Sequence, residues 1–366
     1  MKRSRVASVA LATFLMLHSA VCLRLSAGDF LPALPGYTFD FPRDHGSHDD
    51  YRTEWWYYTG HLYADDGRRY GFELTFFRVG VAPPGTPAES RWDLHNVAVA
   101  HFAITDVNGK SFRYYEKLNR MSPFTASAAA GRLDVFNESW RATTRPDGAW
   151  QLTASAGSDT IDLALRARKA PAVHGENGIS VKAQGVGFAS HYYSMTRLDV
   201  NGIVNNRHCR GAAWMDHEFG SSALRESQQG WDWYSIQLDN DAELMLYVIR
   251  RADGSPDVTS SGSLITSDGQ VIHVRAEQMR ITSSARWHSS KSGATYPMGW
   301  RVTVPAFRID VTLQPLLRDQ ELVTKASTGV TYWEGACDVS GSFDGNAVSG
   351  DGYVEMTGYD RAFRAP

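Results

Sequence analysis

Cysteine is scarce in this sequence: its 366 residues include only three cysteines, at positions 22, 209 and 337. None of them forms a Cys-x-x-Cys pair, which excludes a thiolate zinc site or a redox motif of that pattern. Cys209 and Cys337 lie 128 residues apart. We favour two buried free thiols there, and the alternative is a disulfide that bridges two domains in an oxidising compartment.

The sequence also lacks a strong excess of charge of one sign. Lys and Arg total 37 against 40 Asp and Glu, a formal net charge of −3. Four of the basic residues and none of the acidic ones lie in residues 1–27, so the remainder has 33 basic against 40 acidic residues and a net charge of −7. An acidic body without a basic run argues against nucleic acid or an anionic membrane as the main partner.

Long apolar runs are missing except near the N-terminus. A basic start, with Lys2, Arg3 and Arg5, leads into an apolar stretch over residues 6–17. That stretch is too short to span a bilayer and has the layout of a secretory signal. We therefore predict a Sec-type signal peptide over residues 1–27 and export to the periplasm or the extracellular space. A lipid anchor on Cys22 is the alternative, and membrane association is expected only in that case.

Helical periodicity is nearly absent, and strict alternation of apolar and polar residues takes its place. Residues 150–155, 161–166 and 307–313 alternate in this way, which is typical of half-buried antiparallel strands. Asp-Gly and Asn-Gly dipeptides, Asp66-Gly67 among them, separate the runs and favour tight hairpin turns. The sequence predicts an all-β chain.

A similar pair of strands occurs twice. A Trp-Tyr strand leads through an acidic turn into a strand that ends in Arg, first over residues 56–78 and again over residues 233–250. A duplicated hairpin predicts two β domains, and closed antiparallel barrels are the natural form for so many short strands. We place the domains at 36–220 and 231–363, with a polar, Gly-flanked linker at 221–230.

The first candidate for chemistry is the polar and aromatic segment 44–60. On a strand, Glu54 and Trp56 share one face while Trp55 and Tyr57 share the other. A carboxyl group beside an indole in an apolar cavity has a raised pKa and can act as an acid. The alternative is structural: Arg52 neutralises Glu54 or Asp50, and the tryptophans close one end of a barrel.

The second candidate is the tripeptide Asp216-His217-Glu218. Its imidazole, flanked by two carboxylates, suits general acid or base catalysis near neutral pH. On a regular strand Asp216 and Glu218 share one face and His217 points to the other, so only a bulge or turn brings all three together. The spacing matches no metal motif, and we predict neither a metal nor a cofactor. A buried charge network at a domain junction is the alternative.

Further aromatic residues predict a lining for an apolar ligand. Trp231, Trp233 and Ser235 share one face of a strand, and Asp232, Tyr234 and Ile236 the other. Such a density of aromatics suits a flat or conjugated ligand, although a barrel core uses the same residues. The segment 191–197, with Tyr192, is a weaker candidate for the same lining. No nucleophile elbow, phosphate loop or dinucleotide fingerprint occurs in the sequence.

Four blocks together resemble the AttH / carotenoid 1,2-hydratase lipocalin-like family. These blocks lie at residues 41–60, 214–220, 230–234 and 332–336, and the resemblance covers residues 36–363. It implies two lipocalin-like β-barrel domains packed together. It also implies hydration of an isolated double bond of an acyclic carotenoid without a cofactor: an acid protonates the alkene, aromatic rings stabilise the cation, and water adds. Related fungal proteins act as cyclases, and many exported bacterial members are described only as secreted hydrolases.

The hydratase pattern matches this sequence only in part. The Asp-His pair of the hydratases matches Asp216-His217, but Phe219 replaces the Trp expected two residues after that His. The hydratases also carry an Asp two residues after a Tyr that matches Tyr247, and Ile249 stands there in this chain. A different acid, from Glu54, Glu218 or Asp232, would then have to supply the proton.

These observations lead to three functional hypotheses. The first is an exported protein that binds an apolar, unsaturated ligand and hydrates, isomerises or cyclises it. Its expected catalytic residues are Asp216, His217, Glu218 and Glu54, and its expected lining is Trp55, Tyr57, Tyr192, Trp231, Trp233 and Tyr247. The second hypothesis is a non-catalytic periplasmic carrier of lipids or isoprenoids. The third is a secreted hydrolase, for which the sequence shows no nucleophile beside a His.

Overall fold

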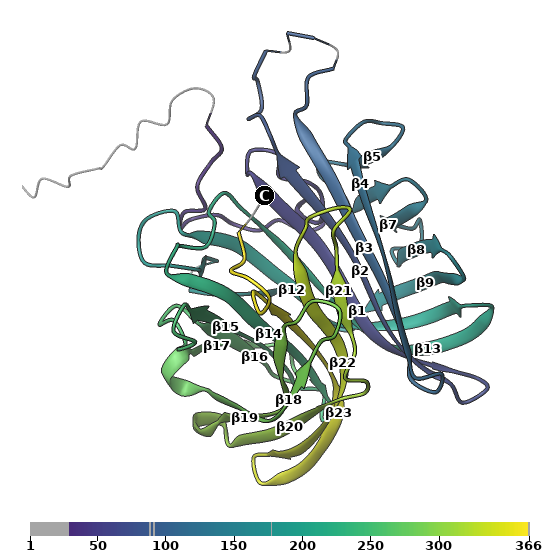
Figure 1. The fold of residues 1–366 in the computed structure, drawn as a ribbon, viewed down its shortest axis with the longest axis vertical. Coiled ribbons are helices and arrows are strands. Elements are labelled where there is room, and N and C mark those ends of the chain that lie inside the picture. The colour runs from purple at the N-terminus through teal and green to yellow at the C-terminus, as the bar shows by residue number, and fades with distance from the viewer. Residues whose placement is uncertain (1–28, 88, 91, 177, 365–366) are drawn as a thin grey trace, which may run out of the picture.

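The computed structural model describes residues 29–364 except positions 88, 91 and 177. The predicted signal peptide and Cys22 lie outside the described residues. In the part of the chain that the structure describes, no helix is long and apolar enough to cross a membrane. The described chain is built from two antiparallel sheets with short 3-10 turns, so the all-β prediction is confirmed (Figure 1).

The first sheet takes strands from the N-terminal part of the chain, in the order β4-β3-β2-β1-β13-β12-β9-β8-β7-β6-β5, with β10 and β11 also paired to β12. Its bounds are β1 Thr53–Ala64, β2 Arg69–Gly80, β3 Asn96–Asp106, β4 Ser111–Arg120, β5 Ala126–Ala128, β6 Asp134–Asn137, β7 Trp140–Thr144, β8 Trp150–Ala156, β9 Asp159–Ala167, β10 Ala172–Val173, β11 Ser180–Val181, β12 Ala189–Val204 and β13 Arg207–Gly220. The sheet curls into a nearly closed barrel. Asn119 on β4 bonds Asn137 on β6 at 2.7 Å across the remaining gap.

The second sheet has the order β17-β16-β15-β14-β23-β22-β20-β19-β18, with β21 also paired to β22, and forms a half-barrel. Its bounds are β14 Gln228–Leu238, β15 Glu243–Arg251, β16 Ser261–Ile265, β17 Val271–Arg275, β18 Arg280–His288, β19 Thr295–Val304, β20 Ile309–Pro315, β21 Glu321–Val323, β22 Thr331–Phe343 and β23 Asn346–Thr357. The 3-10 turns are η1 Arg43–His45, η2 Ala276–Gln278 and η3 Pro305–Phe307.

Each sheet has its own apolar core, and the two sheets also bury a layer between them. Strand β8 alternates between buried and half-exposed positions, because one of its faces meets solvent. Strands β1 and β13 are buried over most of their length on both faces. One face looks into the barrel and the other packs on the second sheet, so side chains on both faces of these strands are buried. We call the side chains between the two sheets the inter-sheet layer.

Polar contacts join the sheets around this layer. His61 on β1 donates from Nε2 to the carbonyl oxygen of Gly352 on β23, at 2.9 Å. At another side of the layer, Lys169 Nζ lies 2.7 Å from Glu243 Oε2, and Arg197 Nε lies 2.6 Å from Glu243 Oε1. Because Glu243 is fully buried, the two cations compensate the loss of its hydration. Cys209 and Cys337 lie in separate cores as buried free thiols, so the disulfide alternative is wrong.

Candidate functional site

Strands β1 and β13 pair with each other, and their alternation divides the predicted site residues between two environments. Tyr57 is the cross-strand partner of Asp216, and Trp55 is the partner of Glu218. These four side chains face the inter-sheet layer. Trp56 is the partner of His217, and both point into the barrel, as does Glu54. No bulge interrupts the pairing here, so Asp216 and His217 lie on opposite faces of one strand.

Asp216 is buried in the inter-sheet layer and accepts three hydrogen bonds. Tyr192 Oη and Trp214 Nε1 donate to its two carboxyl oxygens, each at 2.6 Å, and Ser194 donates as well. Burial raises the pKa of Asp216 to about 7, against the lowering effect of the three donors. A carboxyl group with this pKa exchanges a proton readily at neutral pH.

Glu218 lies on the same face of β13 as Asp216, with a cation as its partner. Lys182 Nζ is 2.8 Å from Glu218, and Ser190 also donates to this carboxylate. The ammonium group of Lys182 lies 4.3 Å from the ring centre of Tyr247 and 5.2 Å from that of Tyr192. Glu218 is therefore neutralised by a local ion pair, whereas no cation contacts Asp216 among the described residues.

The six aromatic residues predicted as lining lie together in the inter-sheet layer. They belong to one apolar cluster that also contains Trp214, Met245, Ile249 and Tyr353. Trp231 and Trp233 share a face of β14, and Tyr234 and Ile236 point into the core of the second sheet, as the alternation predicts. Trp233 donates from Nε1 to Tyr192 Oη at 3.0 Å across the two sheets. Trp55 and Trp231 are half-buried, which places them at the edge of the layer.

Three acidic residues of this layer were not predicted from the sequence: Glu73 on β2, Glu334 on β22 and Glu355 on β23. Glu334 and Glu355 are cross-strand partners, and Glu355 is also the partner of Trp233. Tyr57 Oη donates to Glu334 Oε1 at 2.7 Å from the opposite sheet. Tyr332 and Thr75 donate to Glu73 Oε1 at 3.2 and 2.9 Å. These contacts join residues up to 277 positions apart, so the local sequence does not reveal them, although Glu334 lies in the family block 332–336.

Burial raises the pKa of all three acids. Burial is the largest cause, and it raises the pKa of Glu73 to about 7 and that of Glu355 to about 8. The pKa of Glu334 is raised well above its ordinary value by burial and by the negative charges of Glu73 and Glu355. Oε2 of Glu334 and Oε2 of Glu73 are buried and have no hydrogen-bond partner within the described chain. These raised pKa values favour the protonated form of the carboxyl groups, which can then donate a proton.

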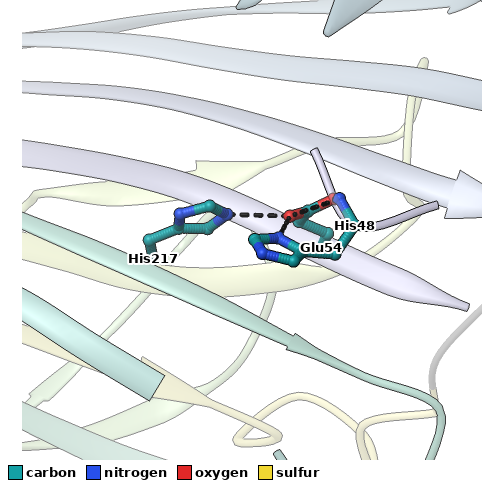
Figure 2. A group of neighbouring side chains, drawn as sticks. All are labelled: His48, Glu54 and His217. Atoms are coloured by element: carbon teal, nitrogen blue, oxygen red, sulfur yellow. Dashed lines mark hydrogen bonds and ion pairs between the residues drawn. The ribbon is translucent and has the colours of Figure 1, made fainter. Parts of the chain in front are cut away.

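Glu54 and His217 take part in a different cluster, inside the barrel. His48 Nδ1 and His217 Nε2 lie 2.7 and 2.8 Å from the same oxygen, Glu54 Oε1 (Figure 2). Arg78 Nε contacts the other oxygen, Oε2, at 3.1 Å. Although burial opposes ionisation, the two imidazoles and the guanidinium hold the pKa of Glu54 well below its ordinary value. Glu54 is therefore an ionised partner in a closed network and not a proton donor to the inter-sheet layer.

The other acids considered for the missing hydratase Asp also have fixed partners. Asp232 points into the second sheet, where Arg250 and Tyr359 contact it at 2.9 and 3.0 Å. Ile249, at the position of the hydratase Asp, lies in the inter-sheet cluster. The inter-sheet layer therefore has an apolar residue at the expected position, and its acids stand at other positions, one of which, Glu334, lies in the family block 332–336.

The comparisons with known proteins agree with this architecture. Residues 32–359 match the AttH-like family, and the chain belongs to this family. A solved structure described as an AttH protein, from Nitrosomonas europaea, is 33% identical, with a TM-score of 0.81 over 90% of this chain and 99% of that one.

More distant relatives have the same fold or a related sequence. Kievitone hydratase from Nectria haematococca is 14% identical, with a TM-score of 0.69 over 88% of this chain and 93% of that one. A curated relative, the dehydratase asqC of Emericella nidulans, is 21% identical over 290 residues, which cover 69% of this chain and 75% of that protein. Relatives of this family member thus include proteins named for the addition or removal of water.

Proposed function

We propose that this chain is an exported, cofactor-free catalyst that protonates an apolar, unsaturated ligand in the inter-sheet layer. Protonation of the ligand gives a carbocation, and its hydration is the leading reaction. Isomerisation results if the carbocation loses a proton before water adds, and cyclisation results if it first closes a ring. The observation that carries the proposal is Glu334: a fully buried carboxyl group with a raised pKa, one unpartnered oxygen and aromatic neighbours. The names of the hydratase and dehydratase relatives support the same chemistry.

Glu334 is the proposed acid because its hydrogen bonds leave one oxygen free. Tyr57 donates to Oε1, so the acidic proton of Glu334 resides on Oε2, which has no acceptor within the described chain. An alkene carbon placed beside Oε2 takes this proton. The positive charge that forms on the neighbouring carbon is stabilised by the π faces of the surrounding Trp and Tyr residues.

Asp216 is the proposed base. Its three donors hold the carboxylate in place, and its pKa of about 7 allows it to take a proton from water near neutral pH. As that water adds to the cation, its oxygen bonds to carbon and its second proton goes to Asp216. The ligand gains one water molecule. A proton passes from Asp216 to the Glu334 carboxylate through solvent, which restores both groups.

A second function, that of a carrier, is favoured by the close packing of the layer. Tyr57, Trp214, Trp233 and Tyr353 are all buried, so a ligand enters only if side chains at the layer move. The half-buried Trp55 and Trp231 mark the edge where entry begins. A protein that takes up an apolar ligand in this way without converting it would be a periplasmic carrier of lipids or isoprenoids.

The test uses lycopene in detergent as the probe, with binding followed by quenching of tryptophan fluorescence and products by mass spectrometry in H₂¹⁸O. The proposal predicts a product that gains one labelled water, or an isomer. It also predicts a loss of at least about 100-fold in rate for Glu334→Gln and Asp216→Asn. Glu321→Gln is the matched control, because Glu321 is equally buried but bonds Tyr296 at 2.9 Å in the core of the second sheet. Binding without conversion by the wild type would favour the carrier.

A further inference from the structure

Three side chains from distant parts of the sequence direct donor atoms at one point inside the barrel. His48 lies in the loop before β1, Glu54 lies at the start of β1, and His217 lies near the end of β13. Their donor atoms, His48 Nδ1, His217 Nε2 and Glu54 Oε1, all lie within 4.8 Å of one another (Figure 2). Two imidazole nitrogens and one carboxylate oxygen form a donor set that zinc and related metals prefer.

The far side of each imidazole has the support that metal-binding histidines usually have. His48 Nε2 lies 3.4 Å from Asp44 Oδ1, and His217 Nδ1 lies 3.0 Å from Tyr193 Oη. A histidine that binds a metal with one nitrogen normally uses the other in such an outer hydrogen bond, which fixes the tautomer and the ring. Tyr193 is itself fixed by His45 Nδ1 at 2.7 Å. Both rings are therefore held so that His48 Nδ1 and His217 Nε2 face Glu54.

The hydrogen-bond inventory of His48 also fits a cation between the rings. Its two nitrogens face two carboxylates, Asp44 and Glu54, which are both acceptors. A neutral imidazole has only one N–H and satisfies one of these carboxylates, whereas an imidazolium, or a neutral ring with a metal on one nitrogen, satisfies both. With a metal on Nδ1, the N–H at Nε2 donates to Asp44, and the metal satisfies Glu54 as well.

The local charge accommodates a divalent cation. Arg78 contacts Oε2 of Glu54 and leaves Oε1 to the histidines, while Asp49 lies 3.4 Å from Arg78 and partly compensates it. Arg43 pairs with Asp44 at 2.7 Å on the outer side. With Asp40, which lies 3.6 Å from Arg43, four carboxylates surround the two guanidiniums, so acidic groups are in excess around this cluster.

We propose that His48, Glu54 and His217 form a binding site for a divalent transition metal of the zinc type, within the barrel of the first sheet. Nothing in the sequence marks this site, because 163 residues separate Glu54 from His217. The metal would tie the loop that contains His48 to β1 and β13 and so hold one end of the barrel closed. His217 points away from the inter-sheet layer, so this site does not depend on the function proposed for that layer.

The experiment measures metal bound to the full mature chain. The protein is treated with a chelator, incubated with excess Zn²⁺, passed through a desalting column and analysed by elemental mass spectrometry. We expect about one zinc per chain, and a loss of at least about 100-fold in affinity for His48→Gln and His217→Gln. Asp44→Asn should lower the affinity by about 10- to 100-fold, because Asp44 only supports His48. His101→Gln is the matched control: His101 is as buried as His217, but it bonds Tyr332 at 2.7 Å outside the cluster.

A second measurement keeps the proposal testable if a variant fails to fold. Co²⁺ added to the chelator-treated wild type should give visible absorption bands of a low-symmetry site with nitrogen ligands, and Zn²⁺ should abolish them. Less than about 0.1 zinc per wild-type chain, or no such bands, would overturn the proposal. Equal zinc content in the wild type and in a folded His48→Gln protein would overturn it as well.

Discussion

The hydroxyl group of Tyr57 on β1 donates a 2.7 Å hydrogen bond to Glu334 on β22, so the two sheets share a buried tyrosine–carboxyl pair. Tyr57 is also the cross-strand partner of Asp216, which joins the proposed acid and the proposed base through one side chain. This pair gives the inter-sheet layer a fixed polar centre among aromatic rings.

Replacement of Tyr57 by Phe should destabilise the protein by about 1–3 kcal/mol, because Glu334 then has no hydrogen-bond donor at either oxygen. The measurement is urea denaturation at pH 7. Tyr63→Phe is the matched control, since its exposed hydroxyl also reaches the other sheet, at 3.1 Å from Asp351. A Tyr57→Phe protein no less stable than the Tyr63→Phe protein would contradict the importance of this pair.

The stability should depend on pH through Glu73. Its folded-state pKa of about 7 exceeds its ordinary value of 4.5, so the folded state binds the proton more tightly than the unfolded state. The stabilisation of the folded state by this proton is complete below about pH 4.5. It is lost as the pH rises to about 7, and the free energy of unfolding then falls by no more than about 1.4 kcal/mol per pH unit. Glu73→Gln resembles the protonated acid and should remove this slope.

The measurement of that slope is urea denaturation at pH 5, 6, 7 and 8 for the wild type and Glu73→Gln. The variant should gain stability relative to the wild type as the pH rises. The exposed Glu277→Gln is the control, since it makes the same change at a carboxylate outside the inter-sheet layer. A difference between Glu73→Gln and the wild type that stays constant over this range would show that Glu73 is ionised in the folded state.

Inside the barrel, Arg78→Met should cost about 3–5 kcal/mol, because it removes a buried cation and leaves Glu54 and two backbone carbonyls without that partner. Arg301→Met removes an ion pair with Asp310 of 2.6 Å that is exposed to solvent, and it should have a much smaller effect on stability. Thermal unfolding of both variants at pH 7 gives the comparison. Similar costs for the two would contradict a buried ion pair at Glu54.

Export predicts a specific mass for the mature protein. When the full chain is expressed with its N-terminus intact, the exported product should lack about the first 27 residues and carry no lipid. Intact-mass spectrometry of the periplasmic and culture fractions measures both properties. A product that starts at Cys22 with added acyl mass would favour the lipid anchor, and an uncleaved chain would contradict export.

The faces of the strands could be predicted from the sequence because alternation is a local property. It correctly separates Asp216 from His217 and places Trp231 beside Trp233. The buried acids Glu73 and Glu334 could not be found in this way. Their environment arises only when strands far apart in the chain pack face to face, and an acid on a strand exposed to solvent has the same local sequence pattern.

The convergence of His48, Glu54 and His217 has the same explanation. Glu54 was considered as an acid because of the indoles beside it, yet its environment is set by Arg78, 24 residues further along, and by His217, 163 residues further along. Pairing of β1 with β2 and β13 brings these residues together. The register of that pairing is a property of the whole barrel and not of any short segment.

Infrared difference spectroscopy tests most directly whether Glu334 is a protonated carboxyl group at neutral pH. The spectrum of Glu334→Gln at pH 7 is subtracted from that of the wild type, with ¹³C-labelled glutamate used to assign the carboxyl bands. We predict that the variant lacks a protonated C=O band that is present in the wild type at pH 7. A lost band that belongs instead to an ionised carboxylate at pH 7 would contradict the account.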